Sequence, residues 1–122
     1  MGWYYDLIAF KKAYALAMRI FEITKKFPKE EKYSLTSQFR RSSRSVCANI
    51  AEAYKRRRYK DYYISKLSDC ETENCETEVW IKFSKDCQYI SLEEFSELHS
   101  ENDEVARLIN YMINNPEKFS KF

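Results

Sequence analysis

The sequence predicts an all-α protein, an antiparallel up-and-down four-helix bundle. Apolar residues recur at three- and four-residue steps through four long segments, and short connections join these segments. The one glycine of the 122 residues is Gly2, so the chain lacks the glycines of tight hairpin turns and phosphate-binding loops. We therefore expect one domain over residues 1–122 with a single core, and no nucleotide-binding enzyme of the common types.

The first helix is expected at about residues 6–26, from Asp6 as N-cap to a stop before Pro28. It carries two apolar strips, although a helix of a lone bundle needs one. The first strip comprises Trp3, Leu7, Phe10, Tyr14, Ala17, Met18 and Phe21, and the second comprises Ala9, Ala13, Leu16, Ile20 and Ile23. The second strip packs either against another helix of the same chain or against another subunit. Our candidate subunit contact there is Ala9, Ala13, Leu16 and Ile20.

The second helix, expected at about residues 35–57, has a basic flank beside its apolar stripe. Four cations line this flank over about 27 Å of helix, at about 1.5 Å per residue: Arg40, Arg44, Lys55 and Arg58. From residue 40 to residue 60 there are eight basic residues and one acid, so this segment is +7 and the rest of the +2 chain is about −5. The acid, Glu52, is expected to pair with Arg56 one turn further on.

This basic flank predicts a nucleic-acid-binding surface. Arginine pairs bidentately with phosphate, and tyrosine stacks on unpaired bases. The candidate residues are Arg40, Arg44, Lys55, Arg56, Arg57, Arg58, Tyr54 and Tyr59, with RNA as the expected ligand. Alternatively, the flank is an exposed helix face whose cations serve solubility or pair with acids of a neighbouring subunit. The modest net charge of +2 leaves this alternative open.

The third helix is expected at about residues 60–87, where seven residues form a bundle seam: Tyr59, Tyr63, Leu67, Cys70, Asn74, Thr77 and Ile81. Asn74 and Thr77 are polar, so they need hydrogen-bond partners, and Asn49 is one candidate. On another face, Trp80 and Phe83 form a second candidate subunit contact. The fourth helix is expected at about residues 92–114, opened by a capping box of Ser91 and Glu94.

No pattern in the sequence predicts catalysis or metal binding. The single histidine, His99, has no nucleophile at a recognisable spacing, and no H-E-x-x-H or E-x-x-H arrangement occurs. The four cysteines contain no C-x-x-C pair, so we expect reduced structural thiols. We therefore expect no catalytic residue, metal, cofactor or small-molecule substrate. Because no leader or membrane-spanning run is present, we expect a soluble, cytoplasmic protein without a membrane partner.

Several motifs resemble a known family. The run KFPKEEKYSLTSQFRR at residues 26–41, followed by NIAE at residues 49–52, resembles the four-helix-bundle proteins encoded in intervening sequences of bacterial 23S ribosomal RNA genes. The family pattern is roughly FP-x-EE-x-YGLTSQLRRA and then SIPSNIAEG. Residues 76–77 (ET) and 85–90 (KDCQYI) look like its ET-x and K-x-LGY-I segments. Ser34, Cys47 and Ala53 depart from the usual glycine, proline and glycine.

The resemblance covers about residues 6–112 and implies a bundle that associates into rings, commonly homopentamers. It also implies structural roles for Asn49, Glu52, Glu76 and Thr77, which lie in the family motifs. RNA is favoured as a ligand because the relatives are encoded within ribosomal RNA genes and resemble accessory subunits of diversity-generating reverse transcriptases. The family has no settled activity. Our hypothesis is thus a non-enzymatic, oligomeric nucleic-acid-binding or scaffolding module; the alternative is a protein-binding adaptor or structural ring without nucleic-acid contact.

Overall fold

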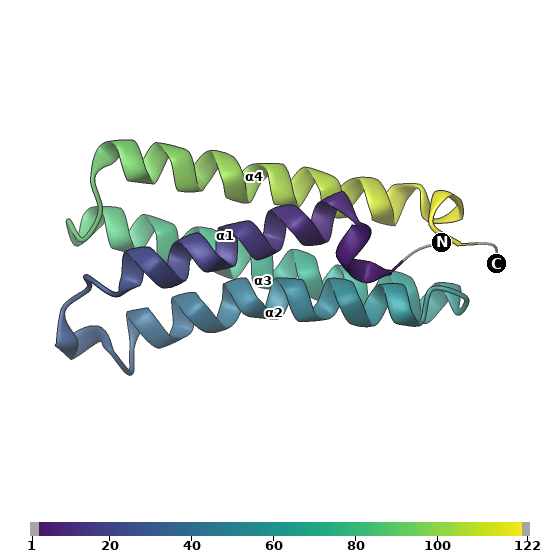
Figure 1. Cartoon of the computed structure of the whole chain (residues 1–122), viewed down its shortest axis with the longest axis horizontal. Coiled ribbons are helices and arrows are strands. Elements are labelled where there is room, and N and C mark those ends of the chain that lie inside the picture. Colours follow the sequence, from purple (N-terminus) through teal and green to yellow (C-terminus); the bar gives the residue numbers. More distant parts are fainter. Residues whose placement is uncertain (1–2, 121–122) are drawn as a thin grey trace.

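The computed structural model describes residues 3–120, which form four antiparallel helices (Figure 1). The helices are α1 (Ile8–Thr24), α2 (Leu35–Lys55), α3 (Lys60–Asp86) and α4 (Leu92–Asn114). Single 3-10 turns lie at Tyr4–Asp6, Lys29–Glu31 and Pro116–Lys118, and residues 3–120 contain no strand. The predicted fold class is confirmed, and each predicted helix bound lies within two residues of the observed one.

The two predicted helix starts have different outcomes. Asp6 is not the N-cap of α1: it lies in the preceding 3-10 turn, where its carboxylate accepts a hydrogen bond from the Trp3 amide at 3.3 Å. The capping box of α4 is confirmed. The Glu94 amide donates to Ser91 Oγ at 3.0 Å, and the Ser91 amide donates to Glu94 Oε1 at 2.9 Å. These two bonds satisfy backbone donors that the first turn of α4 leaves without helical partners.

All four helices contribute to one apolar core. In the bundle α3 packs against α2 and α4, and α1 packs against the same two helices. The largest fully buried apolar side chains include Ile20, Phe39, Ile50, Tyr63, Leu67, Ile81, Leu98 and Ile109. Within residues 3–120, no helix combines the length and the apolar character that crossing a bilayer requires.

The core corrects the predicted subunit contact on α1. Ala9, Ala13, Leu16 and Ile20 are each no more than 4% exposed, because they pack inside the chain's own bundle. They leave no surface for another subunit. The strip with the aromatic residues is the exposed one, with Tyr14 54% exposed. Both strips repeat with the helical period, so the period alone does not tell which of them faces the core.

Buried polar side chains on α3 are bonded to its two neighbours. Asn74 Nδ2 donates to Asn102 Oδ1 at 2.9 Å, and Asn102 Nδ2 donates to the Asn74 carbonyl at 3.2 Å. Thr77 Oγ1 lies 2.8 Å from Ser42 Oγ. The predicted partner Asn49 takes no part, because it is half-buried at the bundle edge and bonds within α2. Asn74 and Thr77 therefore have hydrogen-bond partners, but neither partner is the residue we expected.

The α3–α4 turn contains a left-handed residue, Gln88, with φ of 64°. The next amide, of Tyr89, donates to the Ser84 carbonyl at 2.9 Å and so ends α3. The Tyr89 hydroxyl donates to Glu31 Oε2 at 2.8 Å, which ties this turn to the α1–α2 connection at the same end of the bundle (Figure 1). This end lies opposite the α2–α3 turn.

Candidate functional site

The predicted basic flank divides into two groups along α2. Arg40 and Arg44 lie in the N-terminal half of the helix, on the side of α1. The other four cations, Lys55, Arg56, Arg57 and Arg58, lie where α2 ends and turns into α3; we call these four residues the basic turn. At about 1.5 Å per residue, Arg44 and Lys55 are about 16 Å apart along the helix axis. The predicted flank thus consists of two separate groups of cations.

Arg40 is bound within the chain. Its Nε donates to Thr24 Oγ1 at 2.8 Å, and its Nη2 donates to the Phe21 carbonyl at 3.4 Å. The guanidinium carbon also lies 4.8 Å from the centroid of the Phe21 ring. This half-buried side chain thus joins α2 to the C-terminal turn of α1. Its donors are directed at α1 rather than at a ligand.

The arginines of the basic turn lie over tyrosine rings. The distances from guanidinium carbon to ring centroid are 4.0 Å for Arg57 on Tyr54, 5.1 Å for Arg58 on Tyr59 and 5.9 Å for Arg56 on Tyr62. These contacts hold the guanidinium groups in place without neutralising their charge. Arg57 Nη1 also donates to the Tyr54 carbonyl at 2.9 Å, so it helps to close the turn. Sequence analysis missed Tyr62, because only the turn brings it near Arg56.

Some arginines form ion pairs with carboxylates, and others do not. Three of them form ion pairs: Arg19 with Glu97 and Glu101, Arg41 with Glu73 and Glu76, and Arg107 with Asp103. By contrast, no carboxylate among residues 3–120 lies within ion-pair distance of Arg44 or of any residue of the basic turn. Among the described residues, the arginines without a carboxylate partner therefore all lie on α2 and the turn after it.

The predicted pair of Glu52 and Arg56 does not form. Glu52 Oε1 lies 3.1 Å from Lys66 Nζ on α3, and this hydrogen bond raises the pKa of Lys66. Arg56 follows the last residue of α2, so it leaves the helix face on which a partner four residues away would lie. Glu52 instead links α2 to α3.

Two further family-motif residues, Glu76 and Thr77, also lie in the α2–α3 seam. Glu76 binds Arg41 and accepts a hydrogen bond from Trp80 Nε1 at 3.3 Å, and the bond to Glu76 is the main cause of the raised pKa of Arg41. Thr77 bonds to Ser42. These contacts give the α2–α3 seam a polar network.

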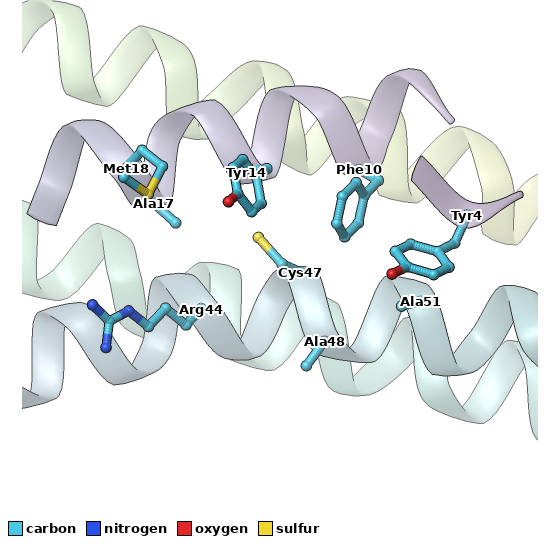
Figure 2. A pocket seen from close by; sticks show the side chains of 9 residues that line it. All are labelled: Tyr4, Phe10, Tyr14, Ala17, Met18, Arg44, Cys47, Ala48 and Ala51. Carbon is cyan, nitrogen blue, oxygen red and sulfur yellow. The ribbon is translucent and has the colours of Figure 1, made fainter. Parts of the chain in front are cut away.

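An apolar groove lies on the opposite side of α2, against α1 (Figure 2). This α1–α2 groove has a volume of about 410 Å³. Its lining residues are Tyr4, Phe10, Tyr14, Ala17, Met18, Arg44, Cys47, Ala48 and Ala51. Among the described residues, Arg44 is the one charged side chain in this lining. Burial raises the pKa of Cys47 to about 11, so the thiol at the base of the groove stays protonated at neutral pH.

Sequence analysis did not identify this groove. One sequence feature could have indicated the groove: α2 has small residues at positions 47, 48 and 51. In the structure these residues face the aromatic strip of α1. From the sequence, we considered another subunit only for the second strip of α1, so an open groove beside the aromatic strip was not expected.

The second candidate subunit contact is partly exposed. Phe83 is 51% exposed, and its ring centroid lies 5.9 Å from that of Trp80, which is half-buried. Together with Leu35 and Gln38 they line a groove of about 390 Å³ between α2 and α3. This surface is available to a second molecule, and its role as a subunit contact stays a prediction.

The remaining reactive side chains do not converge. Cys47 and Cys70 are buried and Cys75 and Cys87 are exposed, and none of the four forms a disulfide. His99 is exposed, beside the Phe95 ring. Residues 3–120 contain no group of three or more histidine, cysteine or acidic side chains arranged to hold a metal ion.

The fold and these surfaces define a small all-α bundle with a basic turn at one end and an apolar groove along one side. Residues 5–111 match the family model described as 23S rRNA-intervening sequence protein, and the chain belongs to this family. The resemblance found in the sequence is thus confirmed. A similar solved structure is that of a protein of unknown function from the S23 ribosomal protein family of Bacteroides thetaiotaomicron. It is 28% identical with a TM-score of 0.81, over 89% of this chain and 97% of that one. A search of curated proteins found no match.

Proposed function

We propose that the protein is a non-enzymatic, oligomeric module that binds RNA phosphates through the basic turn. The observation that carries this proposal is the set of adjacent cations without a carboxylate partner among the described residues, on a molecule whose other arginines are mostly ion-paired. Cations without an acidic partner release condensed counterions when they bind phosphate, which is the main source of sequence-independent affinity for nucleic acids.

The tyrosines of the basic turn support the same proposal. A guanidinium that already lies over an aromatic ring loses less side-chain entropy when it binds a phosphate. Tyr59, 50% exposed, offers a surface on which an unpaired base can stack. Membership of a family described by the 23S rRNA intervening sequence favours RNA over DNA as the ligand. The competing explanation is that Lys55 and Arg56 only stabilise the negative end of the α2 macrodipole.

Salt-dependent binding separates these explanations. We expect a labelled single-stranded RNA of about 20 nucleotides to lose about 50-fold in affinity between about 50 and about 200 mM salt, if four cations each neutralise one phosphate. For the Arg56→Ala/Arg58→Ala variant the same change in salt should cost about sevenfold, because two phosphate contacts remain. Arg57 is left in place because it bonds to the Tyr54 carbonyl. Fluorescence anisotropy measures both slopes.

The matched control is Lys29→Ala/Lys32→Ala. These two lysines are exposed and lie in the α1–α2 connection, at the other end of the bundle, so the variant removes the same net charge (Figure 1). The control should keep the steep salt slope of the unmodified protein. Equal slopes in all three proteins, or no binding at about 50 mM salt, would contradict RNA binding by the basic turn.

The oligomer belongs to the same proposal. A ring would repeat the basic turn several times and convert modest affinity into avidity. Our remaining candidate contact is the strip of Trp80 and Phe83 on α3, and the family resemblance suggests a pentamer. Light scattering should give a multiple of 14.8 kDa that falls in a Phe83→Ser variant. A monomer at micromolar concentration would contradict it.

The alternative of a protein-binding adaptor is favoured by a different observation, the exposed apolar α1–α2 groove. This surface is separate from most of the basic turn, so the two functions do not exclude each other.

A further inference from the structure

We propose that the α1–α2 groove is a docking site for an acidic amphipathic helix of a partner protein. This inference does not depend on RNA binding, since it rests on the groove and on the charges of Arg44 and Lys55, whether or not Lys55 also binds phosphate. The argument combines the shape of the groove, the extent of the apolar surface around it and the sign of its charge.

The shape fits a helix. The groove lies between two adjacent antiparallel helices, with small side chains (Ala17, Cys47, Ala48 and Ala51) between taller ones (Figure 2). Tyr4, Phe10 and Tyr14 form a continuous aromatic wall, with ring centroids 5.0 and 5.8 Å apart. Small residues let another helix approach closely, and the spacing between packed helices depends on the side chains at the contact.

The apolar surface is larger than a small ligand would need. Beyond the groove, Trp3 is 60% exposed and connects to Tyr4 through the Tyr5 ring, and on the groove wall Met18 is 44% exposed. These residues and the aromatic wall follow α1 and the turn before it. A contiguous exposed patch of this kind is typical of a protein-interaction surface. An occupant that covers it must extend along α1, as a helix does.

The charge of the groove indicates an acidic occupant. Arg44 lines it and has no carboxylate partner among residues 3–120, and no acidic residue appears in the lining. Lys55 lies three helical turns further on, on the same face of α2. Cations therefore flank the Ala48 and Ala51 surface at both ends. A helix with an apolar stripe and carboxylates about three turns apart matches this pattern, in the helix-in-groove mode of recognition.

The chain's own most acidic helix is a poor candidate for the occupant. On α4, Glu97 and Glu101 bind Arg19, Glu104 binds Lys12, and Asp103 binds Arg107. These carboxylates are already engaged within the same chain, so a second copy would have to break ion pairs to present them. We therefore favour a different protein as the partner.

A displayed library of helical peptides tests the proposal directly. The library has a fixed apolar stripe and allows Glu, Lys or Ser at the flanking positions, and it is selected against the full chain. We expect Glu to be enriched over Lys at these positions. The selected peptides should bind Ala48→Arg and Arg44→Glu at least tenfold more weakly, as measured by fluorescence anisotropy. Ala48 is exposed, so its substitution should leave the fold intact, and circular dichroism of the variant checks this.

A second test exchanges the charges of the peptide and of the groove. A selected peptide with its Glu residues changed to Lys should bind Arg44→Glu better than it binds the unmodified protein. The Arg56→Ala/Arg58→Ala variant is the control, and it should keep the peptide affinity within about twofold while RNA binding falls. Selection of neutral or basic peptides, or equal binding to Ala48→Arg, would overturn the proposal. A lower oligomer mass of Ala48→Arg in light scattering would also overturn it, because the occupant would then be a second copy.

Discussion

The seams that α3 forms with its neighbours differ from the seam between α1 and α2. On the α3 side, Arg41 binds two glutamates and the Asn74–Asn102 pair is buried and mutually bonded. On the α1 side, Arg44 has no carboxylate partner among the described residues and an apolar groove remains. The cause lies in the neighbouring helix: α3 is rich in glutamate, whereas the one acid within α1 is Glu22, which pairs with Lys25.

This difference shows that the side chains of the neighbouring helix determine whether a cation on α2 forms an intramolecular ion pair or remains exposed. Where the neighbour offers carboxylates, the cation stabilises the fold. Where it offers apolar and aromatic side chains, the charge stays available to another molecule. Substitutions in the two kinds of seam should therefore have different consequences, and three predictions test this contrast.

The largest effect is expected for Asn102→Leu, which removes the side-chain acceptor of the buried Asn74 amide and leaves it only the 3.3 Å bond to the Asn102 carbonyl. We expect the free energy of unfolding to fall by about 1–3 kcal/mol. Ala48→Leu in the α1–α2 groove should change it by less than about 0.5 kcal/mol. Urea unfolding measures both. The Asn74→Leu/Asn102→Leu double variant should recover part of the loss, because neither amide is then left unpaired. If both single variants were equally destabilised, the contrast between the seams would not hold.

An intermediate effect is expected for Arg40, which uses neutral oxygens of α1. Removing its hydrogen bonds to Thr24 and Phe21 in Arg40→Ala should cost about 1–2 kcal/mol of unfolding free energy. Arg40→Lys should not restore it, because an ammonium group lacks the planar fork that reaches both oxygens. Thermal unfolding of the two variants checks this. Full rescue by lysine would mean that charge alone matters at this position.

The smallest effects are expected for Arg41 and Arg44. Arg41→Ala breaks ion pairs of a side chain that is about half exposed, so we expect a loss below about 1 kcal/mol. That loss should shrink further at about 1 M salt, where exposed charges are screened. Arg44→Ala removes only the contact of the guanidinium with the Phe21 ring, whose centroid is 5.6 Å away, so the free energy of unfolding should change by less than about 0.5 kcal/mol at both salt concentrations. A larger loss would indicate that this cation mainly stabilises the fold.

Much of the fold follows from the sequence. The apolar period locates all four helices, and the capping box of Ser91 and Glu94 fixes the start of α4. The helical period does not tell whether a given apolar strip faces the core or the solvent. Ala13 and Tyr14 are adjacent and each continues an apolar strip, but one is in the core and the other is exposed.

The candidate site was predicted less completely, because it depends on contacts between distant segments. Arg40 and Arg44 are one turn apart, and only the position of Thr24 makes the first of them structural. Glu52 is four residues from Arg56, but α2 ends between them and Lys66 takes the acid. The cluster of cations at the basic turn was visible in the sequence, whereas the tyrosine under Arg56 was not.

The left-handed backbone at Gln88 has a consequence for how this chain can change. In the family pattern a glycine stands at this place, and among residues 3–120 Gln88 is the one non-glycine residue with positive φ. A side chain there costs about 1 kcal/mol or more in steric strain, which the surrounding turn must offset. Replacing Gln88 with glycine should thus stabilise the protein. The added stability would let it tolerate destabilising substitutions elsewhere, including those that reshape its binding surfaces.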